Sequence, residues 1–347
     1  MEKFIIFGGA GFIGSNLALS ALKMGHEVVI FDNLSRTGTD LNLRTIREHG
    51  GDRVIFHAGD IRSTDDIASL YDRHSDAKAA FHLAGQVAVT TSIKNPREDF
   101  DINLLGTLNI LEAMRERQLK MPLLYASTNK VYGDLKSLSL NEGDQSYTLT
   151  DYSNGIAETF PLDFHSPYGC SKGGADQYAL DYARVYGLRT VVLRQSCIYG
   201  YQQFGVEDQG WVAWFTIASL FERPITIYGN GKQMRDILFI DDLIDAYWKS
   251  LEHIDIAGGR VYNIGGGAYR LSLLQLLDYL ETLMGKPIPV NYAQARQGDQ
   301  KIFVCDTTRA QTELNWKPRI DPEEGVRRLL HWIQNHTALF HESGLLK

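Results

Sequence analysis

Short apolar runs recur along the first 200 residues and are separated by longer, mixed stretches. They lie at Phe4–Phe7, Glu27–Phe31, Val54–His57, Ala79–Leu83, Leu123–Ala126 and Arg189–Arg194. Runs that stay apolar at consecutive positions are typical of strands buried on both faces, as in a parallel sheet. Helical stretches, among them Asn16–Lys23 and Leu104–Arg117, separate these runs. The alternation predicts an α/β fold built on a doubly wound parallel (Rossmann) sheet.

The pattern loosens after Arg194. Helices are expected at Asp241–Leu251, Leu273–Met284 and Gly325–Ile333, and a strand at Val261–Ile264. We expect that strand and the helix before it to return to the main sheet. The prediction is therefore a Rossmann domain of residues 1–195 and 233–266, interleaved with a smaller α/β substrate-binding domain of residues 196–232 and 267–347.

Three glycines, Gly8, Gly11 and Gly14, follow the first strand and open the first helix. Glycines let the backbone approach a pyrophosphate, and the helix N-terminus offers unpaired N–H groups to it. The second strand runs into Asp32, 18 residues after Gly14. A carboxylate there binds the ribose hydroxyls of NAD and repels the 2′-phosphate of NADP. Arg36 nearby tempers that preference, but the pattern predicts an NAD site.

Composition argues against several classes of partner: nucleic acids, metals and membranes. The chain has 347 residues and a net charge of −7, which argues against a nucleic-acid polymer as its partner. Three scattered cysteines form neither a disulfide framework nor a zinc pattern, so no metal is expected and a reducing cytoplasm fits. The apolar start of the chain is too short for a signal peptide or a membrane span, so no membrane association is expected.

The candidate for proton transfer is Tyr168, with Lys172 four residues later. On a helix the two side chains share a face, and an ammonium stabilises a phenolate by the roughly 4 kcal/mol needed near neutral pH. Tyr132/Lys136 and Tyr228/Lys232 have the same spacing, but both tyrosines lead into turns. Only Tyr168 follows a plausible helix entry, Ser166-Pro167, and precedes a long run with few helix breakers.

Together these residues resemble the extended short-chain dehydrogenase/reductase family, which contains the nucleotide-sugar epimerases and dehydratases. The matching motifs are the glycine loop, Gly59-Asp60, His82-Leu83-Ala84, Asn103 with Gly106-Thr107, Ser127-Thr128, Tyr168/Lys172, Arg194, and Arg235-Asp236 with Asp241-Asp242. The resemblance covers nearly the whole chain. Two departures are Phe7, where threonine is usual, and Cys197, where asparagine is usual; the second concerns local substrate contacts.

The resemblance implies NAD that stays tightly bound and is not consumed, with a nucleotide-diphosphate sugar over it. Thr128 would hydrogen-bond the reacting hydroxyl, Tyr168 would take its proton, and Lys172 would lower the tyrosine pKa and hold the nicotinamide ribose. The implied cofactor residues are Gly8, Gly11, Phe12, Ile13, Asp32, Asn33, Ser35, Arg36, Asp60, Ile61, Leu83, Ala84, Gly85, Asn103, Ser127, Tyr168 and Lys172. The implied substrate residues are Gln86, Thr90, Thr128, His165, Gln203, Arg235, Arg296 and Asp299.

Longer runs are similar to one branch of the family, the CDP-paratose 2-epimerases, also called CDP-tyvelose epimerases. These runs are 85–92, 127–134, 163–173 and 208–212. They imply epimerisation at C2 and a role in lipopolysaccharide O-antigen biosynthesis. A 4-epimerase shares the catalytic residues. A 4,6-dehydratase usually carries an Asp-Glu pair after the threonine, whereas this chain has Asn129-Lys130. A NAD-sensing regulator would not need Thr128, Tyr168 and Lys172.

Some segments keep two interpretations. The 40-residue stretch between Thr128 and Tyr168 either flanks the sugar or is a surface excursion. Trp211, Trp214 and Phe215 either pack in the core or stack on a nucleotide base. A guanidinium suits a diphosphate, which favours Arg235 and Arg296 for that contact. By analogy with relatives, helices at 99–117 and 168–187 would pair in a homodimer, or in a homotetramer built from it.

Overall fold

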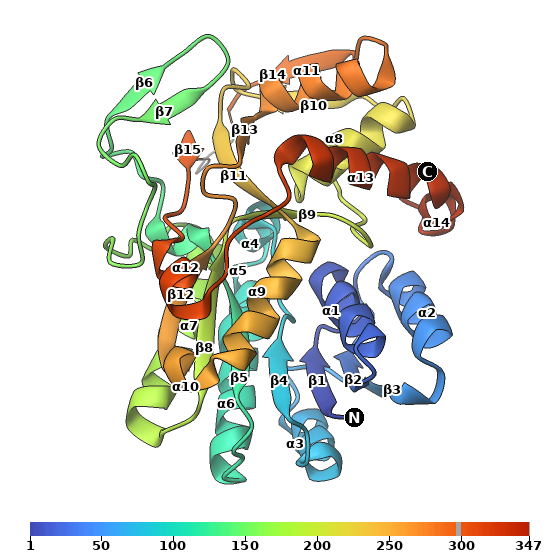
Figure 1. Cartoon of the computed structure of the whole chain (residues 1–347), viewed down its shortest axis with the longest axis vertical. Helices are drawn as coiled ribbons and strands as arrows, with labels where there is room; N and C mark the ends of the chain where they lie inside the picture. The colour runs from blue at the N-terminus through green and yellow to red at the C-terminus, as the bar shows by residue number, and fades with distance from the viewer. Residues whose placement is uncertain (296–299, 347) are drawn as a thin grey trace.

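The computed structural model describes residues 1–295 and 300–346. Seven parallel strands form the main sheet, in the spatial order β12-β8-β5-β4-β1-β2-β3 (Figure 1). They are β1 (Lys3–Phe7), β2 (Glu27–Asp32), β3 (Val54–Ala58), β4 (Ala79–His82), β5 (Leu123–Thr128), β8 (Thr190–Gln195) and β12 (Arg260–Ile264). Every strand predicted from an apolar run is present, and β12 lies beside β8. The chain therefore returns to the main sheet after leaving it, as expected.

Side chains alternate between two hydrophobic clusters, one on each face of this sheet. From β1, Phe4 and Ile6 pack on the face covered by α1 (Phe12–Lys23), α2 (Thr39–Gly50) and α9 (Ile240–Glu252). Ile5 and Phe7 pack on the other face, with α3 (Thr64–His74), α6 (Gly106–Glu116) and α7 (Ser166–Tyr186). Burial on both faces explains why these strands are apolar at every position.

The smaller domain is built on a second, mixed sheet above the carboxyl ends of the main strands (Figure 1). Its strands are β9 (Cys197–Tyr199), β11 (Met234–Phe239), β13 (Arg270–Ser272) and β15 (Ile302–Phe303), with a separate pair β10 (Ile225–Tyr228) and β14 (Val290–Ala293). Helices α8 (Trp211–Leu220), α11 (Leu273–Met284) and α13 (Pro322–Asn335) pack around them. Within residues 233–266, β12 joins the main sheet while β11 pairs with β9, β13 and β15. The domain boundaries stay a prediction.

Local signals account for where the helices begin. The bounds of α11 match the predicted Leu273–Met284, because Ser272 and Gln275 form a reciprocal capping box. Asp321 caps α13 by accepting from the Glu324 N–H, and Pro322 follows it at the first helical position. The first helix begins at Phe12, four residues earlier than predicted, since Gly11 is its N-cap.

Shorter elements complete the described chain. They are the 3-10 turns η1 (Gly51–Arg53) and η3 (Asn129–Tyr132), the π-helical turn η2 (Asp101–Leu105), and helices α4 (Val89–Lys94), α5 (Pro96–Phe100), α10 (Ile254–Ala257), α12 (Thr308–Leu314) and α14 (Thr337–Glu342). Among the described residues, no helix combines the length and apolar character needed to cross a membrane.

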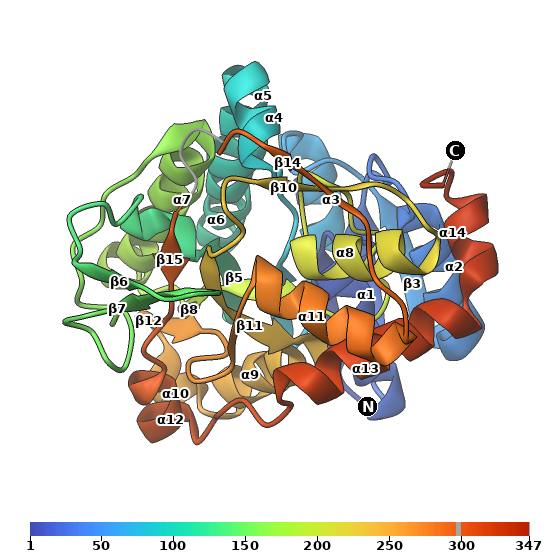
Figure 2. The same ribbon diagram turned by 90° about the horizontal axis from the view of Figure 1, so that it is seen from above.

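The stretch between Thr128 and Tyr168 forms a hairpin, β6 (Leu140–Glu142) and β7 (Tyr147–Leu149), at one side of the molecule (Figure 2). The hairpin is tied to the turn after β10: Tyr147 N–H donates to the Lys232 carbonyl, and Lys232 Nζ pairs with Glu142 at 2.8 Å. It therefore rests on the smaller domain, and whether this stretch flanks the sugar stays a prediction.

The end of the chain joins the two sheets on the opposite side of the molecule. Helix α14 lies beside α2 (Figure 2), and Arg44 of α2 binds both carboxylate oxygens of Glu342 at 2.7 and 2.8 Å. Phe340 is buried against Phe204 and Phe221, whose ring centroids are 5.3 and 5.9 Å from its own. The tail, to which the sequence assigned no role, thus braces the loop after β9.

Candidate active site

The glycine loop fits a dinucleotide because its glycines permit contacts that any side chain would block. Gly8 has a φ of 74°, and a Cβ on it would lie 2.6 Å from the Ala84 nitrogen. A Cβ on Gly14 would lie 2.2 Å from the Gly8 oxygen. Gly11 forms the N-cap of α1 without a side chain to bond the first N–H groups, those of Phe12 and Ile13. These N–H groups suit the oxygens of a pyrophosphate.

Asp32 lies where the second strand ends, beside the glycine loop. Its carboxylate accepts from the Ala10 N–H at 3.0 Å and from the Leu34 N–H at 2.9 Å. Burial raises its pKa, and these backbone bonds oppose the rise. Each oxygen keeps a further lone pair, so the carboxylate can also accept from ribose hydroxyls.

Other residues expected to bind the cofactor lie near Asp32 in the structure. Asn33 donates to Asp60 at 2.9 Å and accepts from the Ser35 N–H at 3.1 Å. Arg62 bonds Asp60 and, as the largest cause, holds the pKa of that carboxyl at about 2. Arg36 instead bonds Gln209 of the smaller domain and lies in electrostatic range of both Asp32 and Tyr168. Ile61 is buried against Gly106.

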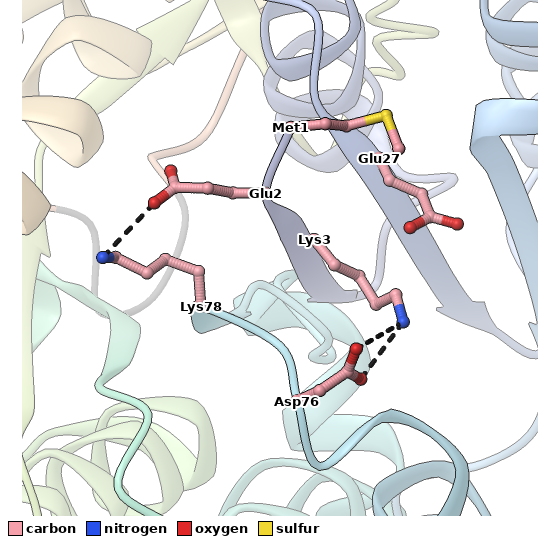
Figure 3. Close-up of a pocket in the computed structure, with 6 residues that line it drawn as sticks. All are labelled: Met1, Glu2, Lys3, Glu27, Asp76 and Lys78. Carbon is pink, nitrogen blue, oxygen red and sulfur yellow. Dashed lines mark hydrogen bonds and ion pairs between the residues drawn. The ribbon is translucent and has the colours of Figure 1, made fainter.

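A pocket at the opposite edge of the sheet has no such chemistry. It is lined by Met1, Glu2, Lys3, Glu27, Asp76 and Lys78, at the amino ends of the strands (Figure 3). Its two lysines already pair with acids: Lys3 with Asp76 at 2.9 Å and Lys78 with Glu2 at 3.3 Å (Figure 3). Ligands of doubly wound sheets bind at the carboxyl edge. The glycine loop, Asp32 and the other motifs lie at the carboxyl edge, so the carboxyl edge carries the candidate site.

The ends of β4 and β5 bring the next predicted residues together. Leu83 donates its N–H to the Phe7 carbonyl at 2.9 Å, which continues the sheet past β4 toward Ala84 and Gly85. Asn103, in the π-helical turn, accepts from the Gln86 N–H at 2.9 Å. A Cβ on Gly85 would lie 2.9 Å from that same Asn103 oxygen and 3.9 Å from Lys172 Nζ. Glycine at position 85 therefore lets this loop lie against Lys172.

The three residues assigned to catalysis meet at this edge. Thr128 ends β5, while Tyr168 and Lys172 lie on α7, and all three are buried. The Thr128 side chain hydrogen-bonds that of Tyr168. Lys172 Nζ donates to the Ala126 carbonyl at 2.5 Å and lies 4.4 Å from the centre of the Tyr125 ring. Ser127, beside Thr128, donates to Asp176 at 2.7 Å, which fixes the end of β5 against α7.

Burial dominates the protonation of the pair. It raises the pKa of Tyr168 to about 12, although the bond from Thr128 opposes the rise. It also lowers the pKa of Lys172 to about 7, against the pull of Asp176 and Asp99. The lowered tyrosine pKa expected from the spacing is thus not produced by the protein's own groups. Tyr168 is protonated at neutral pH until a further positive charge lies near it.

The other two tyrosine–lysine pairs have structural partners. Tyr132 lies in the 3-10 turn η3 and donates to Asn263 at 2.7 Å, while Lys136 pairs with Asp134 at 2.6 Å. Tyr228 lies in a strand and donates to Glu207 at 2.9 Å. Among the described residues, only Tyr168 and Lys172 of the three pairs share a helix, as the sequence predicted.

Several residues expected to bind the substrate are held by protein groups. Gln86 Nε2 donates to Asp99 at 2.7 Å and to the Ala88 carbonyl at 2.9 Å. Buried Gln203 accepts from the Gly200 N–H at 3.3 Å. His165 is exposed and lies 2.9 Å from Asp163. In contrast, the hydroxyl of Thr90 is buried without a hydrogen-bond partner among the described residues.

Arg235 reaches the same side of the molecule from β11. Its Nη1 donates to the Met234 carbonyl at 2.8 Å and its Nη2 to the Gln300 carbonyl at 2.6 Å. Gln300 also bonds Asn129, which follows Thr128, at 3.4 Å. Arg235 is therefore linked by two contacts to the segment that carries Thr128. Arg296 and Asp299, its expected partners at the substrate, lie outside the described residues.

The three aromatic residues that follow β9, Trp211, Trp214 and Phe215, do not all have the same role. Phe215 is buried in the core, and its ring meets Trp211 edge-on at 6.1 Å. The Trp211 side chain hydrogen-bonds Cys197, whose pKa burial raises to about 12, so this cysteine is a thiol. The indole N–H of Trp214 is buried without a partner among the described residues. Packing accounts for Phe215, and base stacking stays open for the two tryptophans.

Two residues of the site were missed from the sequence. Asp99 is buried and bonds Gln86, Asn103 and Ser171. It lies four residues before Asn103, and this spacing was the one signal that could have found it. Gln300 had no comparable signal, because its partners Asn129 and Arg235 are far from it in the chain.

Comparison with known proteins agrees with this geometry. A family model described as GDP-mannose 4,6 dehydratase matches residues 5–329. The chain belongs to this family of nucleotide-sugar epimerases and dehydratases. The resemblance drawn from the motifs is thereby confirmed. The fold class is confirmed as well, since solved epimerases superpose on nearly the whole chain.

Individual relatives show which enzymes of the family this chain is similar to. CDP-paratose 2-epimerase of Salmonella typhi is 45% identical, over 96% of this chain and 99% of its own. UDP-glucuronate 4-epimerase of Thermodesulfobacterium geofontis is 30% identical, over 98% of each chain. Among solved structures, UDP-glucose 4-epimerase of Thermus thermophilus, a complex with NAD, has a TM-score of 0.80 at 29% identity. It covers 96% of this chain and 99% of its own. The chain is an enzyme of this family.

Proposed function

We propose that the protein holds NAD and epimerises a nucleotide-diphosphate sugar at C2, of the type that converts CDP-paratose to CDP-tyvelose. The observation that carries the proposal is the meeting of Thr128, Tyr168 and Lys172 at the carboxyl edge of the sheet that also carries the glycine loop, with Asn129-Lys130 following the threonine. The 45% identity to a CDP-paratose 2-epimerase supports the choice of carbon.

NAD, held by the glycine loop and Asp32, would supply reversible hydride transfer at the sugar carbon, and return of the hydride to the opposite face of the sugar would leave the cofactor unconsumed. The residues of the chain supply the proton transfer and the orientation. Tyr168 takes the hydroxyl proton of the sugar and later gives it back, and Thr128 holds that hydroxyl against Tyr168. Because Tyr168 is protonated in the protein alone, its phenolate would have to be stabilised by positive charge, which the Lys172 ammonium supplies and to which oxidised nicotinamide would add.

The two ends of the substrate would be held by different parts of the molecule. C2 is bonded to the anomeric carbon that carries the diphosphate, so oxidation at C2 brings the diphosphate close to the nicotinamide. Arg235 supplies a guanidinium on that side. The Thr90 hydroxyl in α4, which has no hydrogen-bond partner among the described residues, supplies a hydrogen bond for the sugar. Gln86, which is also expected to contact the sugar, donates to Asp99 and thereby helps to hold the loop after β4.

A labelled substrate tests both the reaction and the carbon. A nucleotide sugar deuterated at C2 should give the C2 epimer with the label retained, because the hydride returns internally. Proton NMR of candidate sugars bearing different bases, incubated with enzyme in deuterium oxide, identifies the preferred substrate. Loss of the label to water would mean proton exchange at carbon and would overturn the mechanism.

The competing function is 4-epimerisation, which uses the same three catalytic residues. Its support is the UDP-glucuronate 4-epimerase, matched over 98% of the chain. Inversion at C4 with C2 untouched would establish it. A 4,6-dehydratase is disfavoured because Asn129 and Lys130 offer no carboxylate for eliminating water. A NAD-sensing regulator is disfavoured because the catalytic residues are intact.

We also propose that the protein forms the predicted dimer through the helices before and after the hairpin, with a tetramer as the alternative. Phe100 on α5 and Tyr178 and Tyr186 on α7 are exposed large apolar residues that such pairing would cover. Sedimentation of the wild type against a Tyr178→Glu variant tests this; an unchanged mass in the variant would exclude α7 as the interface.

A further inference from the structure

A buried carboxylate lies behind the proton-transfer residues, and the proposed reaction makes no use of it. Asp99 of α5 is 1% exposed. Its Oδ1 accepts from Gln86 Nε2 at 2.7 Å and from Asn103 Nδ2 at 3.1 Å, and its Oδ2 accepts from Ser171 Oγ at 2.5 Å. Burial raises the pKa of this carboxyl group above its usual value, while the three neutral donors and the nearby Lys172 oppose the rise and favour the ionised form.

These donors come from separate segments that surround the site. Gln86 follows β4, Asn103 lies in the π-helical turn, and Ser171 immediately precedes Lys172 on α7. Asn103 Nδ2 also donates to the Gln86 carbonyl at 3.0 Å, which closes the network. Wide turns of this kind often accompany functional sites, and this one brings Asn103 toward α7. Through these bonds, Asp99 connects the loop after β4, which carries Gln86, to helix α7, which carries Tyr168 and Lys172.

A comparison with the second carboxylate facing Lys172 shows what is unusual about Asp99. Asp176, one turn further along α7, is bound by Arg194 at 2.9 Å through each of its oxygens. Among the described residues, no cation lies within ion-pair distance of Asp99. No arginine among these residues therefore neutralises the negative charge of Asp99. The cation that interacts with it electrostatically is Lys172.

We propose that Asp99 is a positioning residue for proton transfer, whose negative charge keeps Lys172 in its ammonium form and whose hydrogen bonds fix α7 against the loop after β4. The proposal rests on the proposed function, because it assigns Asp99 a part in that proton transfer. It predicts a dependence on charge, which a purely structural role for Asp99 would not produce.

The direction of the effect follows from the signs. The negative charge of Asp99 raises the pKa of Lys172 and adds to the rise that burial causes in the pKa of Tyr168. Removing that charge therefore lowers both pKa values. Both limbs of a plot of kcat/KM against pH should move to lower pH, each by about one unit, as expected for a charge of this proximity.

Other charged groups near this network contribute to the electrostatic environment of Asp99 and Lys172. From α7 these are Tyr168, Lys172 and Asp176; from β8, Arg194; from the loop after β2, Arg36; from β4, His82; and from α4, α5 and the π-helical turn, Lys94, Arg97, Glu98 and Asp101. His82 is buried with a pKa well below its usual value, so it is neutral across the range of interest. Arg97 pairs with Asp101 at the surface at 2.9 Å.

The test is Asp99→Asn, which has the same shape and can still accept from Gln86 and Asn103 while donating to Ser171. The primary readout is the pKa of Lys172, measured by NMR with carbon-13 at the lysine ε position and assigned by the signal lost in Lys172→Met. We expect Asp99→Asn to lower that pKa by about one unit and to shift both limbs of kcat/KM. Asp101→Asn, a partly buried neighbour in the adjoining π-helical turn whose partner is Arg97, is the matched control and should move neither.

The outcomes separate this proposal from the function on which it rests. If Asp99→Asn lowers kcat at every pH and leaves both the limbs and the Lys172 pKa unchanged, Asp99 is only structural and the proposal fails. If the wild type turns over no nucleotide sugar, the proposed function fails, and the Lys172 titration still decides on Asp99. If Asp99→Asn does not fold, the carboxyl carbon shift of Asp99 in the wild type decides, and a protonated Asp99 at pH 7 overturns the proposal.

Discussion

The carboxyl edge of the main sheet and the smaller domain contribute to the site in different ways. At the sheet edge, several candidate site residues lie at the end of a strand or in the turn that follows it: Gly8 after β1, Asp32 at the end of β2, Ala84 after β4 and Thr128 at the end of β5. In the smaller domain, Arg235 lies within β11, whose partners come from three distant stretches of chain. A parallel sheet thus gathers its site residues by a general rule, whereas the mixed sheet gathers them by pairings particular to this chain.

Ion pairs also differ in burial between the cofactor half and the place where the two halves meet. Within the cofactor half, Arg194 and Asp176 form a buried pair with side-chain exposures of 3% and 0%. The pair Arg44–Glu342, which joins the two halves, has exposures of 47% and 50%. A buried pair is costly to break because the remaining charge has no water, while an exposed pair exchanges its partner for solvent. Variants at these positions should therefore differ sharply.

The largest effect is expected at the sheet edge, from Tyr168→Phe. The substitution removes the proton acceptor and keeps the ring, so turnover should fall by about 10²–10⁴-fold while bound NAD is retained. Turnover assays and the nicotinamide content of the purified protein measure the two effects. Tyr178→Phe, on the exposed side of the same helix, is the control; wild-type turnover in Tyr168→Phe would assign the chemistry elsewhere.

The next largest effect concerns the buried pair of the cofactor half. Arg194→Met leaves Asp176 ionised, buried and without its partner, so the free energy of unfolding should fall by about 3–5 kcal/mol. Urea unfolding measures the change. The double variant Arg194→Met/Asp176→Leu removes both charges and should recover part of the loss; no recovery would show that packing, not the charge of Asp176, dominates at this position.

In the smaller domain, Arg235→Ala should weaken nucleotide-sugar binding by about 10–100-fold, the range for one charge-assisted contact. NAD affinity should not change, because Arg235 belongs to the other sheet. Calorimetric titration with each ligand measures both. Arg296→Ala should act in the same way if the sequence-based assignment holds. An equal loss of NAD affinity in either variant would contradict the assignment of that arginine to the substrate diphosphate.

Cofactor choice depends on Asp32 and should show a smaller effect. The wild type should bind NAD at least about tenfold more tightly than NADP, because the carboxylate repels a 2′-phosphate. Asp32→Ser should reduce that preference. Arg36 bonds Gln209 rather than Asp32, which supports the preference. Equal affinities in the wild type would instead show that Arg36 offsets Asp32.

The smallest effect is expected where the two halves meet. Arg44→Met removes an ion pair whose members are both about half exposed, and the melting temperature should not change measurably. Differential scanning calorimetry beside the Arg194→Met variant gives the comparison directly. A large fall in Arg44→Met would mean that α14 holds the two halves together more strongly than its exposed contacts indicate.

The sequence was sufficient for much of the cofactor half. The apolar runs predicted all seven strands of the main sheet, because strands buried on both faces must be apolar at consecutive positions. The glycine loop was predicted because only glycine permits the approach of Gly8 and Gly14 to neighbouring backbone. Tyr168 and Lys172 were paired correctly on one helix from the proline before them and the run after them. Apart from the approach of Gly8 to Ala84, these signals act between residues that are close in the chain.

Only the tertiary structure decided the protonation of the site and the partners of its polar side chains. The spacing of Tyr168 and Lys172 suggested a lowered tyrosine pKa, but burial by several elements raises it to about 12. Gln86 is expected at the substrate, and the structure adds a partner that the sequence did not indicate, Asp99 of α5. Desolvation and hydrogen bonding depend on which distant segments come together, and that is established only when the whole chain has folded.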